Sequence, residues 1–170
     1  MSASQQPYRV LFLCTGNSAR SIMAEAYLNA AGKGRFVAHS AGSHPLGVVN
    51  RFALELLARR GIDTAGLRSK SWDEFARPDA PAIDFVLTVC DRAAGEACPL
   101  WPGRPITAHW GVDDPAKADG SDADKRAAFA RAFGELAARI ERLLALPVDG
   151  IGCEGIAARL AEIGRAARSA

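Results

Sequence analysis

A strand, a polar loop and a helix follow one another near the start of the chain, and this succession constrains the fold more than any other feature. Residues 10–13 are an apolar run, residues 14–21 read Cys-Thr-Gly-Asn-Ser-Ala-Arg-Ser, and residues 22–28 show a helical pattern. The first turn of a helix has unpaired backbone N–H groups and a partial positive charge, which favour tetrahedral oxyanions. The segment therefore predicts a strand–loop–helix unit with an anion site in the loop.

Cys14 ends the expected strand, and Arg20 stands six residues later at the start of the helix. A helix N-terminus and a nearby arginine lower the pKa of a cysteine from about 8.5 to roughly 3.5–7.5, so we expect a Cys14 thiolate at neutral pH. Gly16 and Asn17 both tolerate positive φ, which suits a loop whose amides turn inward. The loop thus combines a nucleophile with a guanidinium fork. The alternative is a buried cysteine followed by a solvated arginine.

The composition is that of an ordinary globular chain. Its 170 residues suffice for a sizeable core, and 49% of them are hydrophobic and 24% charged. The net charge of +2 is too small to indicate binding to nucleic acid or to a membrane surface. No apolar stretch approaches the ~20 residues of a membrane span, and the N-terminus lacks the layout of a signal peptide, so we expect a cytoplasmic protein. None of the four cysteines forms a C-x-x-C pair, and we expect no bound metal or cofactor.

Strand and helix patterns alternate along the chain. Strands are expected at residues 8–13, 36–40, 83–89 and 106–109, and helices at 21–31, 51–60, 69–75, 121–146 and 153–167. This order predicts an α/β fold, a doubly wound, flavodoxin-like, four-stranded parallel sheet with helices on both faces, plus a C-terminal helical extension. We expect a single domain over residues 1–170, with a core at 8–147 and the C-terminal helix at 148–170. Ligands of such sheets bind at the carboxyl ends of the strands, where the loop after the first strand lies.

The longest expected helix carries two clear signals. Residues 121–124 read S-x-x-D, which is a capping pattern. A stripe of apolar residues follows at helical spacing: Phe129, Phe133, Leu136, Ile140, Leu143 and Leu144. Pro147 ends the helix.

Two further candidate sites follow later strands and should reach the same sheet edge. Cys90 comes directly after the third strand, and Cys98 stands eight residues on, before Pro99. Two thiols near a reactive thiolate suit a relay in which one attacks an adduct and the other resolves the disulfide. The alternative is that Cys90 is a small buried side chain and Cys98 an incidental loop thiol.

Asp114 belongs to the second of these candidate sites, the segment His-Trp-Gly-Val-Asp-Asp-Pro at residues 109–115. Its carboxyl group either protonates a departing oxygen or forms part of a turn.

Taken together, these parts resemble the low-molecular-weight tyrosine phosphatase superfamily and, within it, the arsenate reductases. The resemblance covers roughly residues 9–147. Its markers are Cys14-x5-Arg20-Ser21, Ser40-Ala41-Gly42, the pair Cys90 and Cys98-Pro99, and His109-Trp110-Gly111-x-Asp113-Asp114-Pro115. In the tyrosine phosphatases aromatic residues typically follow the Asp-Pro, and a second cysteine usually precedes the loop arginine. Here Ala116 and Lys117 follow, and Ala19 precedes Arg20, which favours the reductases.

The resemblance implies a mechanism for this chain. Cys14 would attack arsenate, Ser21 would hydrogen-bond the thiolate, and Asp114 would protonate the leaving hydroxide. The loop residues implied to bind the oxyanion are Thr15, Gly16, Asn17, Ser18, Ala19, Arg20 and Ser21. Cys90 would then attack Cys14 and expel arsenite. Cys98 would attack Cys90, and the resulting Cys90–Cys98 disulfide would be left for a thioredoxin-like reductant.

Two departures from the best-known thioredoxin-coupled members bear on partners. The interval from Cys90 to Cys98 is one residue longer, so the external thiol reductant is expected to be a thioredoxin or a glutaredoxin system. Those members also hold a potassium ion near the positions that match Asn17, Glu25 and Ser40. Lys70 stands about where a further acidic ligand should be, and we expect its ammonium to replace the ion. The alternative is a solvated surface lysine.

Three functions are open at this point: an arsenate reductase, a phosphatase acting on phosphotyrosine or a small phosphoester, and a non-enzymatic redox or anion sensor. The phosphatase would share Cys14, Arg20 and Asp114 but make no use of Cys98. Loss of free thiols on addition of arsenate, compared with turnover of p-nitrophenyl phosphate, distinguishes the three. We expect a monomer in each case, and assign no role beyond a structural one to Cys153.

Overall fold

A four-stranded parallel sheet lies at the centre of the computed structural model, which describes residues 6–91, 93 and 101–166. Its strands are β1 (Tyr8–Cys14), β2 (Phe36–Gly42), β3 (Phe85–Thr88) and β4 (Ile106–His109). They lie in the order β2-β1-β3-β4, and each neighbouring pair is parallel. The strand order therefore reverses beside β1, as in the doubly wound fold that the sequence predicts. The end of β1 is the switch point at which such sheets bind ligands.

The strands match the predicted ones in number and order but differ at their ends. The first two strands run further than expected, because Cys14 at the end of β1 lies opposite Gly42 at the end of β2. Strand β3 is shorter than the predicted 83–89. Val89 is buried beyond its end and joins the sheet through its N–H, which donates to the Leu13 carbonyl at 2.8 Å. Cys14 is thus the last residue of a central strand, and the anion loop begins directly at the sheet edge.

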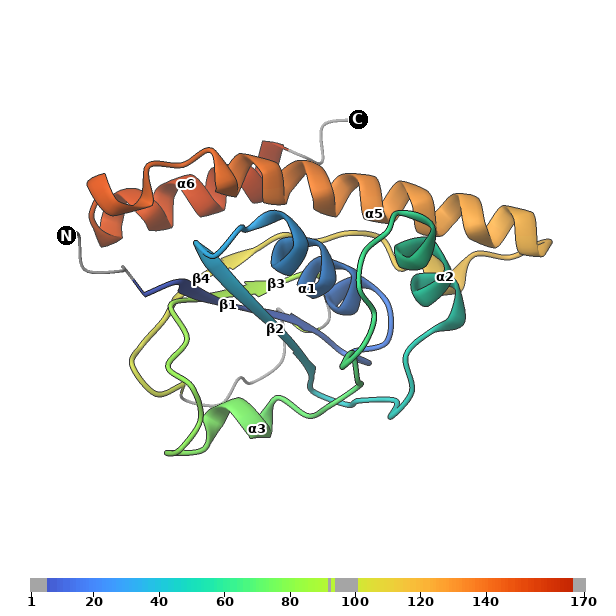
Figure 1. The fold of residues 1–170 in the computed structure, drawn as a ribbon, viewed down its shortest axis with the longest axis horizontal. Helices are drawn as coiled ribbons and strands as arrows, with labels where there is room; N and C mark the ends of the chain where they lie inside the picture. Colours follow the sequence, from blue (N-terminus) through green and yellow to red (C-terminus); the bar gives the residue numbers. More distant parts are fainter. Residues whose placement is uncertain (1–5, 92, 94–100, 167–170) are drawn as a thin grey trace.

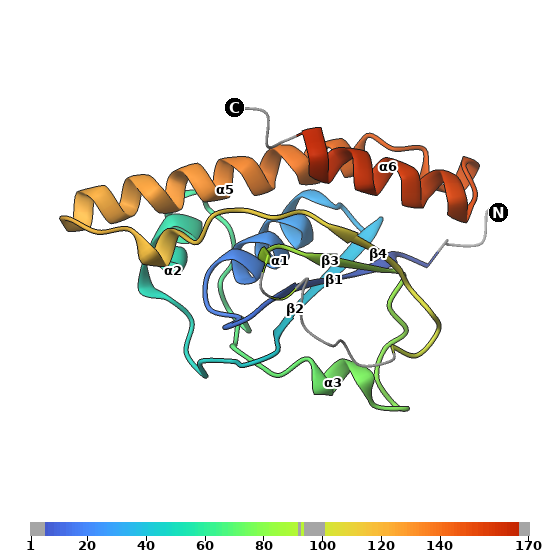
Figure 2. The ribbon, with the colours of Figure 1, turned by 180° about the vertical axis from the view of Figure 1, so that it is seen from behind.

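The helices form two unequal layers around the sheet. They are α1 (Arg20–Ala31), α2 (Arg51–Arg59), α3 (Asp73–Ala76), α5 (Asp122–Leu144) and α6 (Cys153–Ala166). In both ribbon views α5 and α6 lie along one side of the sheet with α1 beneath them, whereas the short α3 lies on the other side (Figure 1, Figure 2). The C-terminal helix α6 approaches β4, so the extension covers the sheet on the side where the last strand lies.

The helix expected at residues 69–75 begins later than predicted. Ser71 forms a parallel bridge with Gly42, and the Gly42 N–H donates to the Lys70 carbonyl at 2.9 Å. This long-range pairing holds residues 70 and 71 beside the end of β2, so helix α3 starts only at Asp73. The pairing brings Lys70 to the edge of the sheet where β1 ends.

The predicted features of the long helix α5 are confirmed. Ser121 and Asp124 form a capping box in which each side chain accepts from the other residue's backbone N–H. Five members of the predicted stripe are buried, namely Phe129, Phe133, Leu136, Ile140 and Leu143. The sixth member, Leu144, is half-buried. Burial of one such side chain contributes about 1.5–3 kcal/mol, so the stripe anchors α5 on the sheet. Arg139 lies on the same stripe and is also fully buried.

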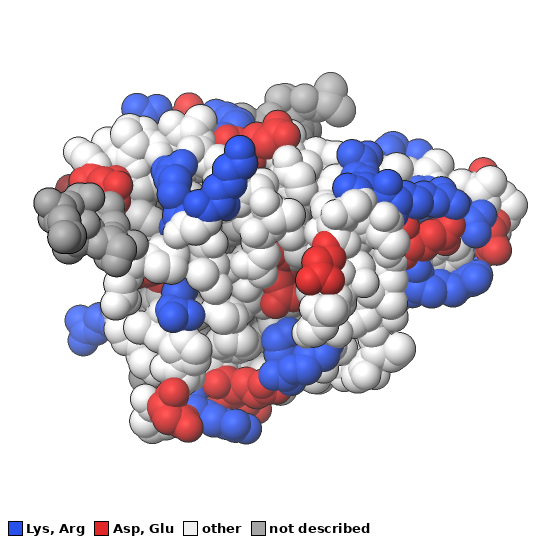
Figure 3. Space-filling model, viewed as in Figure 1, with Lys and Arg blue, Asp and Glu red and all other residues white. Residues whose placement is uncertain are grey.

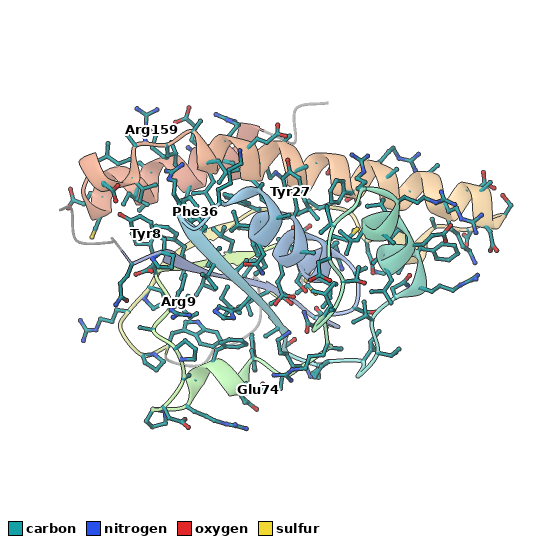
Figure 4. The ribbon with its side chains drawn as sticks, in the orientation of Figure 1. Tyr8, Arg9, Tyr27, Phe36, Glu74 and Arg159 are labelled. Atoms are coloured by element: carbon teal, nitrogen blue, oxygen red, sulfur yellow. The ribbon has the colours of Figure 1, made fainter. Side chains whose placement is uncertain are left out.

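Tyr8 joins the start of the sheet to the C-terminal part of the chain. Its ring packs against Phe36, with 5.8 Å between ring centroids, and against Phe85, with 5.6 Å (Figure 4). Its hydroxyl donates to the carboxylate of Asp149, in a short 3₁₀ helix between α5 and α6. This hydrogen bond to a carboxylate raises the pKa of Tyr8 to about 12.

The surface carries both signs of charge. On the face shown in Figure 3, basic side chains gather over α2 and the first turns of α5, with acidic side chains among them. Arg51 pairs with Asp122, and Arg59 and Arg126 both pair with Glu55. Within residues 6–91, 93 and 101–166, no helix combines the length and the apolar character that a membrane crossing requires.

Candidate active site

The ends of three parallel strands bring the predicted site residues to one sheet edge. Cys14 ends β1, Cys90 follows β3 after one residue, and His109 ends β4. The carboxyl ends of parallel strands share an edge, so the two thiols and the segment leading to Asp114 meet there.

The anion loop wraps around the sulfur of Cys14. The Asn17 N–H donates to Cys14 Sγ at 3.1 Å, which requires the loop to turn back on itself within three residues. Asn17 has a φ of 45°, in the left-handed region that Asn tolerates. Gly16 also tolerates positive φ but is not among the positive-φ residues of the structure, so Asn17 alone of these two residues makes the left-handed turn. A Cβ at Gly16 would lie 3.2 Å from Leu46 Cγ, so a larger residue at position 16 would require the exposed Leu46 side chain to shift slightly.

Asn17 is fully buried and organises the loop from below. The Lys70 N–H donates to Asn17 Oδ1 at 2.9 Å, which sets the orientation of the amide. Asn17 Nδ2 then uses its two hydrogens on Ser21 Oγ, at 2.8 Å, and on Ser40 Oγ, at 3.0 Å. Ser21 Oγ lies 2.9 Å from Cys14 Sγ, and in the thiol either of these two atoms can donate. A thiolate can only accept, so Ser21 is a donor to the sulfur once Cys14 has lost its proton.

A glycine at the end of β2 lets the loop pack against the sheet. A Cβ at Gly42 would lie 2.5 Å from the Thr15 carbonyl oxygen and 3.0 Å from the Asn17 nitrogen. Any larger residue would push the loop away from β2, because backbone atoms cannot yield as a flexible side chain can. In the Ser40-Ala41-Gly42 marker, Gly42 thus allows the close approach of the loop, and Ser40 forms the hydrogen bond with Asn17.

A segment after β2, residues 43–50, lies along the outer side of the loop. Four of its backbone N–H groups donate to loop carbonyls: Ser43 to Cys14 (3.3 Å), His44 to Thr15 (2.9 Å), Leu46 to Gly16 (3.0 Å) and Asn50 to Ser18 (2.9 Å). Leu46 and Val48 on this segment are exposed at 68% and 65%, which is unusual for large apolar side chains. The segment places an apolar rim beside the anion loop.

Burial and hydrogen bonding act in opposite directions on Cys14. Burial raises the pKa of the Cys14 thiol, and the nearby Cys90 sulfur raises it further, whereas the Ser21 hydrogen bond and the charge of Arg20 lower it. The expectation of a lowered pKa rested on the helix N-terminus and Arg20 alone, and it is wrong for the free site because burial has the largest effect. The Ser21 and Asn17 donors stabilise a thiolate once the proton has left.

Arg20 and Asp114 lie together over the loop. Arg20 Nη2 is 3.5 Å from Asp114 Oδ2, and Arg20 Nη1 donates to the Val112 carbonyl at 2.9 Å. Asp114 Oδ1 accepts from the Ala116 N–H at 3.0 Å, which is the turn that Asp-Pro predicts. Cys14, Arg20 and Asp114 line one cavity of about 100 Å³. The nucleophile, the cation and the candidate acid therefore share one small space.

Cys90 is buried on the other side of the loop. Its Sγ lies 3.5 Å from Thr15 Oγ1 and accepts from the Ala93 N–H at 3.3 Å. Together with Arg20 and Asp114, it lines a larger hollow of about 890 Å³. Cys98 and Pro99 lie outside the described residues. Cys153 is exposed at the start of α6.

A second polar pair lies beneath the loop. Glu25 and Lys70 are each only 8% exposed, so the interpretation of Lys70 as a solvated surface lysine is wrong. Ser40 Oγ donates to Glu25 Oε2 at 3.2 Å, and the Lys70 ammonium donates to the Arg68 carbonyl at 2.9 Å. Burial raises the pKa of Glu25, and the charge of Lys70 opposes this. Burial lowers the pKa of Lys70, and the charge of Glu25 opposes this.

Residues 9–150 match the family model described as low molecular weight phosphotyrosine protein phosphatase. The chain belongs to this family. An arsenate reductase of Halalkalibacterium halodurans is 39% identical over 132 residues, which are 78% of this chain and 91% of that relative.

Solved structures from the family have the same fold. The crystal structure of an arsenate reductase from Archaeoglobus fulgidus DSM 4304 superposes with a TM-score of 0.63 at 31% identity, covering 81% of this chain and 99% of that one. A low molecular weight protein tyrosine phosphatase from T. tengcongensis gives 0.66 at 28% identity, covering 81% and 97%. Helix α6 lies beyond the part that the family model matches.

Two features around the site were missed in the sequence: the contacts of His109, which was named only as part of a marker, and the buried Arg139. His109 Nδ1 lies 2.8 Å from Thr88 Oγ1, and its Nε2 lies 2.7 Å from Asp91 Oδ1, so β4 is tied to the residue after Cys90. Nothing in the local pattern indicates this contact, because it joins two strands. Arg139 was also missed, although a signal exists: an arginine stands among apolar residues on the core stripe of α5.

Proposed function

We propose that the protein reduces arsenate to arsenite. Curated family members at 33–39% identity are named arsenate reductases, and each spans most of this chain. The observation that carries the proposal is the presence of two buried thiols at one sheet edge. Cys14 lies inside an anion loop, and Cys90 lies 3.5 Å from the next loop residue, Thr15. A phosphatase needs the first of these thiols, and a reductase needs both.

The first step forms a bond between sulfur and arsenic. The backbone N–H groups of residues 15–20 and the Arg20 guanidinium bind the oxyanion, which as a dianion takes the proton of the Cys14 thiol. The thiolate, held by the Ser21 and Asn17 donors, attacks arsenic. Asp114 gives a proton to the departing hydroxide, which leaves as water. Arsenic is still pentavalent at this stage.

The second step is the reduction. Cys90 attacks the sulfur of Cys14, so a disulfide bond forms and the sulfur–arsenic bond breaks. The electron pair of the broken bond stays on arsenic, which leaves as arsenite with the proton of the Cys90 thiol. Two thiols are oxidised while arsenic gains two electrons. Cys98 then attacks Cys90 and releases Cys14, leaving a Cys90–Cys98 disulfide for an external thiol reductant.

The reductant is a thioredoxin or a glutaredoxin system, and the enzyme works as a cytoplasmic monomer without a bound cofactor. Both kinds of reductant attack a disulfide through a thiolate and so need the Cys90–Cys98 bond at the surface. Reconstitution with each purified system, compared at equal concentrations, decides between them.

Thiol titration after addition of arsenate tests the proposal. The unmodified protein should lose two thiols for each arsenite formed, and Cys14→Ser should lose none. Arg20→Lys should also strongly reduce the rate of arsenite formation, because an ammonium cannot replace the bidentate guanidinium. Cys98→Ser should complete one round and stop as a Cys14–Cys90 disulfide, identified by mass spectrometry. Multiple turnovers by Cys98→Ser would show that an external thiol resolves the site, and no thiol loss in the unmodified protein would exclude the reductase.

Phosphatase activity is the second candidate function. It is favoured by the apolar rim at Leu46 and Val48, which could contact an aryl group beside the anion loop. The likeness to the T. tengcongensis phosphatase also supports it. Turnover of p-nitrophenyl phosphate without loss of thiols, unchanged in Cys98→Ser, would identify this activity.

A further inference from the structure

Three consecutive carbonyl groups lead into the segment that carries Asp114, and all three accept from arginines. Arg139 Nη1 donates to the Trp110 carbonyl at 2.7 Å and to the Gly111 carbonyl at 2.9 Å. Arg20 Nη1 donates to the next one, of Val112, at 2.9 Å. Asp114 follows two residues later. The path of the backbone toward the candidate acid is therefore set by two guanidinium groups.

Arg139 reaches these carbonyls from inside the core. Its side chain is fully buried on α5, in the stripe between Leu136 and Ile140. An arginine keeps its charge in such a place, and burial of a charge costs several kcal/mol unless its donors are well used. A leucine at position 139 would continue the stripe without that penalty. The presence of an arginine at this position is therefore explained by the two carbonyl groups to which it donates.

Helix α6, which lies on the same side of the sheet as α5, also contacts this segment. The Trp110 indole Nε1 donates to the Leu160 carbonyl at 2.9 Å, although a helix carbonyl ordinarily bonds within its own helix. A Cβ at Gly164 would lie 2.1 Å from the His109 carbonyl oxygen and 2.9 Å from Trp110 Cδ1. Helix α6 therefore packs its backbone directly on residues 109–110. The contact comes from the part of the chain outside the family match.

The sheet fixes the remaining backbone groups of this segment. The Trp110 N–H donates to the Thr88 carbonyl at 2.7 Å, and the Val112 N–H donates to the Val89 carbonyl at 3.0 Å. The segment is thus hydrogen-bonded to three elements: the sheet, α5 and α6. A segment held by three elements keeps a side chain two residues later within a narrow range of positions, as catalysis requires.

We propose that Arg139, together with helix α6, is a clamp that positions Asp114 for proton transfer. Arg139 is a positioning residue: it is proposed to act through the backbone carbonyls of residues 110 and 111 and not by contact with the oxyanion or Cys14. The proposal rests on the proposed function in that it takes Asp114 as the acid. It assigns a role to α6, which the family mechanism does not use.

A double-mutant cycle on the purified full chain tests the clamp. Arg139 Nη1 alone serves both carbonyls, and Arg139→Lys keeps a positive charge on a side chain that ends one bond short of this nitrogen, so the ammonium does not reach both carbonyls from the same place. A general acid increases a reaction rate by about 10²–10⁴-fold. We expect Arg139→Lys to lower kcat for arsenate roughly tenfold and to leave KM within about twofold of that of the unmodified protein. In an Asp114→Asn background the same change should cost less than about twofold, because the acid that it positions is already gone.

Two controls separate positioning from general damage. Arg126→Lys makes the same replacement on the same helix at a surface pair with Glu55, and should leave kcat unchanged. Trp110→Phe removes the indole donor to Leu160 while keeping an aromatic ring, and should show the same dependence on Asp114 as Arg139→Lys. It serves as the test if Arg139→Lys does not fold.

Hydrogen–deuterium exchange examines the clamp without any substrate. Exchange at residues 110–114 should become faster in Arg139→Lys, while residues 36–42 in β2 should keep their rate. Equal losses of kcat in both backgrounds, or unchanged exchange at 110–114, would overturn the clamp. If the unmodified protein consumes no thiols with arsenate, the proposed function fails instead, and the exchange result still decides the clamp.

Discussion

Replacement of Ser21 by alanine should raise the pKa of Cys14 by about one to two units. The change removes the hydroxyl that lies 2.9 Å from Cys14 Sγ and leaves the rest of the loop in place. A thiolate cannot donate, so in the negative form of Cys14 the Ser21 hydroxyl donates to the sulfur and stabilises its charge. Burial already raises the pKa of Cys14, so the loss of this donor adds to an existing bias toward the thiol.

The magnitude follows from the strength of a hydrogen bond to a charged group. Such a bond contributes about 1.5–3 kcal/mol. One pKa unit corresponds to about 1.36 kcal/mol, so the shift should be about one to two units. At a pH below both pKa values, the fraction of thiolate should fall by roughly 10- to 100-fold, and alkylation by iodoacetamide should slow by a similar factor.

The assay is the pH dependence of alkylation at Cys14, in a background where Cys90, Cys98 and Cys153 are serines. Ser18→Ala is the matched control, since the Ser18 hydroxyl donates to the Val48 carbonyl at 3.0 Å and not to the sulfur. It should leave the titration unchanged. If Ser21→Ala shifts the midpoint by less than about 0.3 units, hydrogen bonding from Ser21 does not stabilise the thiolate, and the assigned donor direction is wrong.

Two further predictions concern groups away from the sulfur. Lys70→Ala should weaken arsenate binding or make activity depend on potassium. The activity of the unmodified protein should be the same in potassium and in sodium at constant ionic strength. Strong stimulation of the unmodified protein by potassium would contradict this prediction. Tyr8 has a pKa of about 12 in the fold against an ordinary 10.0, so its bond to Asp149 contributes stability below pH 10 that is lost as the pH rises toward 12. The urea midpoint should fall more steeply over that interval than in Tyr8→Phe, and parallel slopes would disprove the contribution.

Local patterns in the sequence predict much of this fold. The succession of strand, loop and helix around Cys14, the capping box at Ser121 and the stripe on α5 all depend on residues within a few positions of one another, and the structure has these three features. The four strands and their order follow from the alternation of elements. Each of these features depends on residue types at short, regular intervals along the chain, and such intervals can be read from a single sequence.

The features that were missed depend on residues far apart in the chain. Helix α3 starts late because Ser71 pairs with Gly42, which no local propensity indicates. The pKa of Cys14 rises because the surrounding fold buries it, and the sequence shows only the charges nearby. Arg139 was visible as an exception on an apolar stripe, but its partners at residues 110–111 come from another element.

The backbone bonds between residues 43–50 and the anion loop have a consequence for engineering. The four attachments use main-chain N–H groups, so the side chains at positions 44, 46 and 48 can be exchanged without loosening the loop. Proline is the exception at the four donor positions, since it has no N–H to give. The natural Pro45 falls between two donors. A library that randomises this rim while keeping Gly42 would change which molecules reach the site and leave the reacting groups alone.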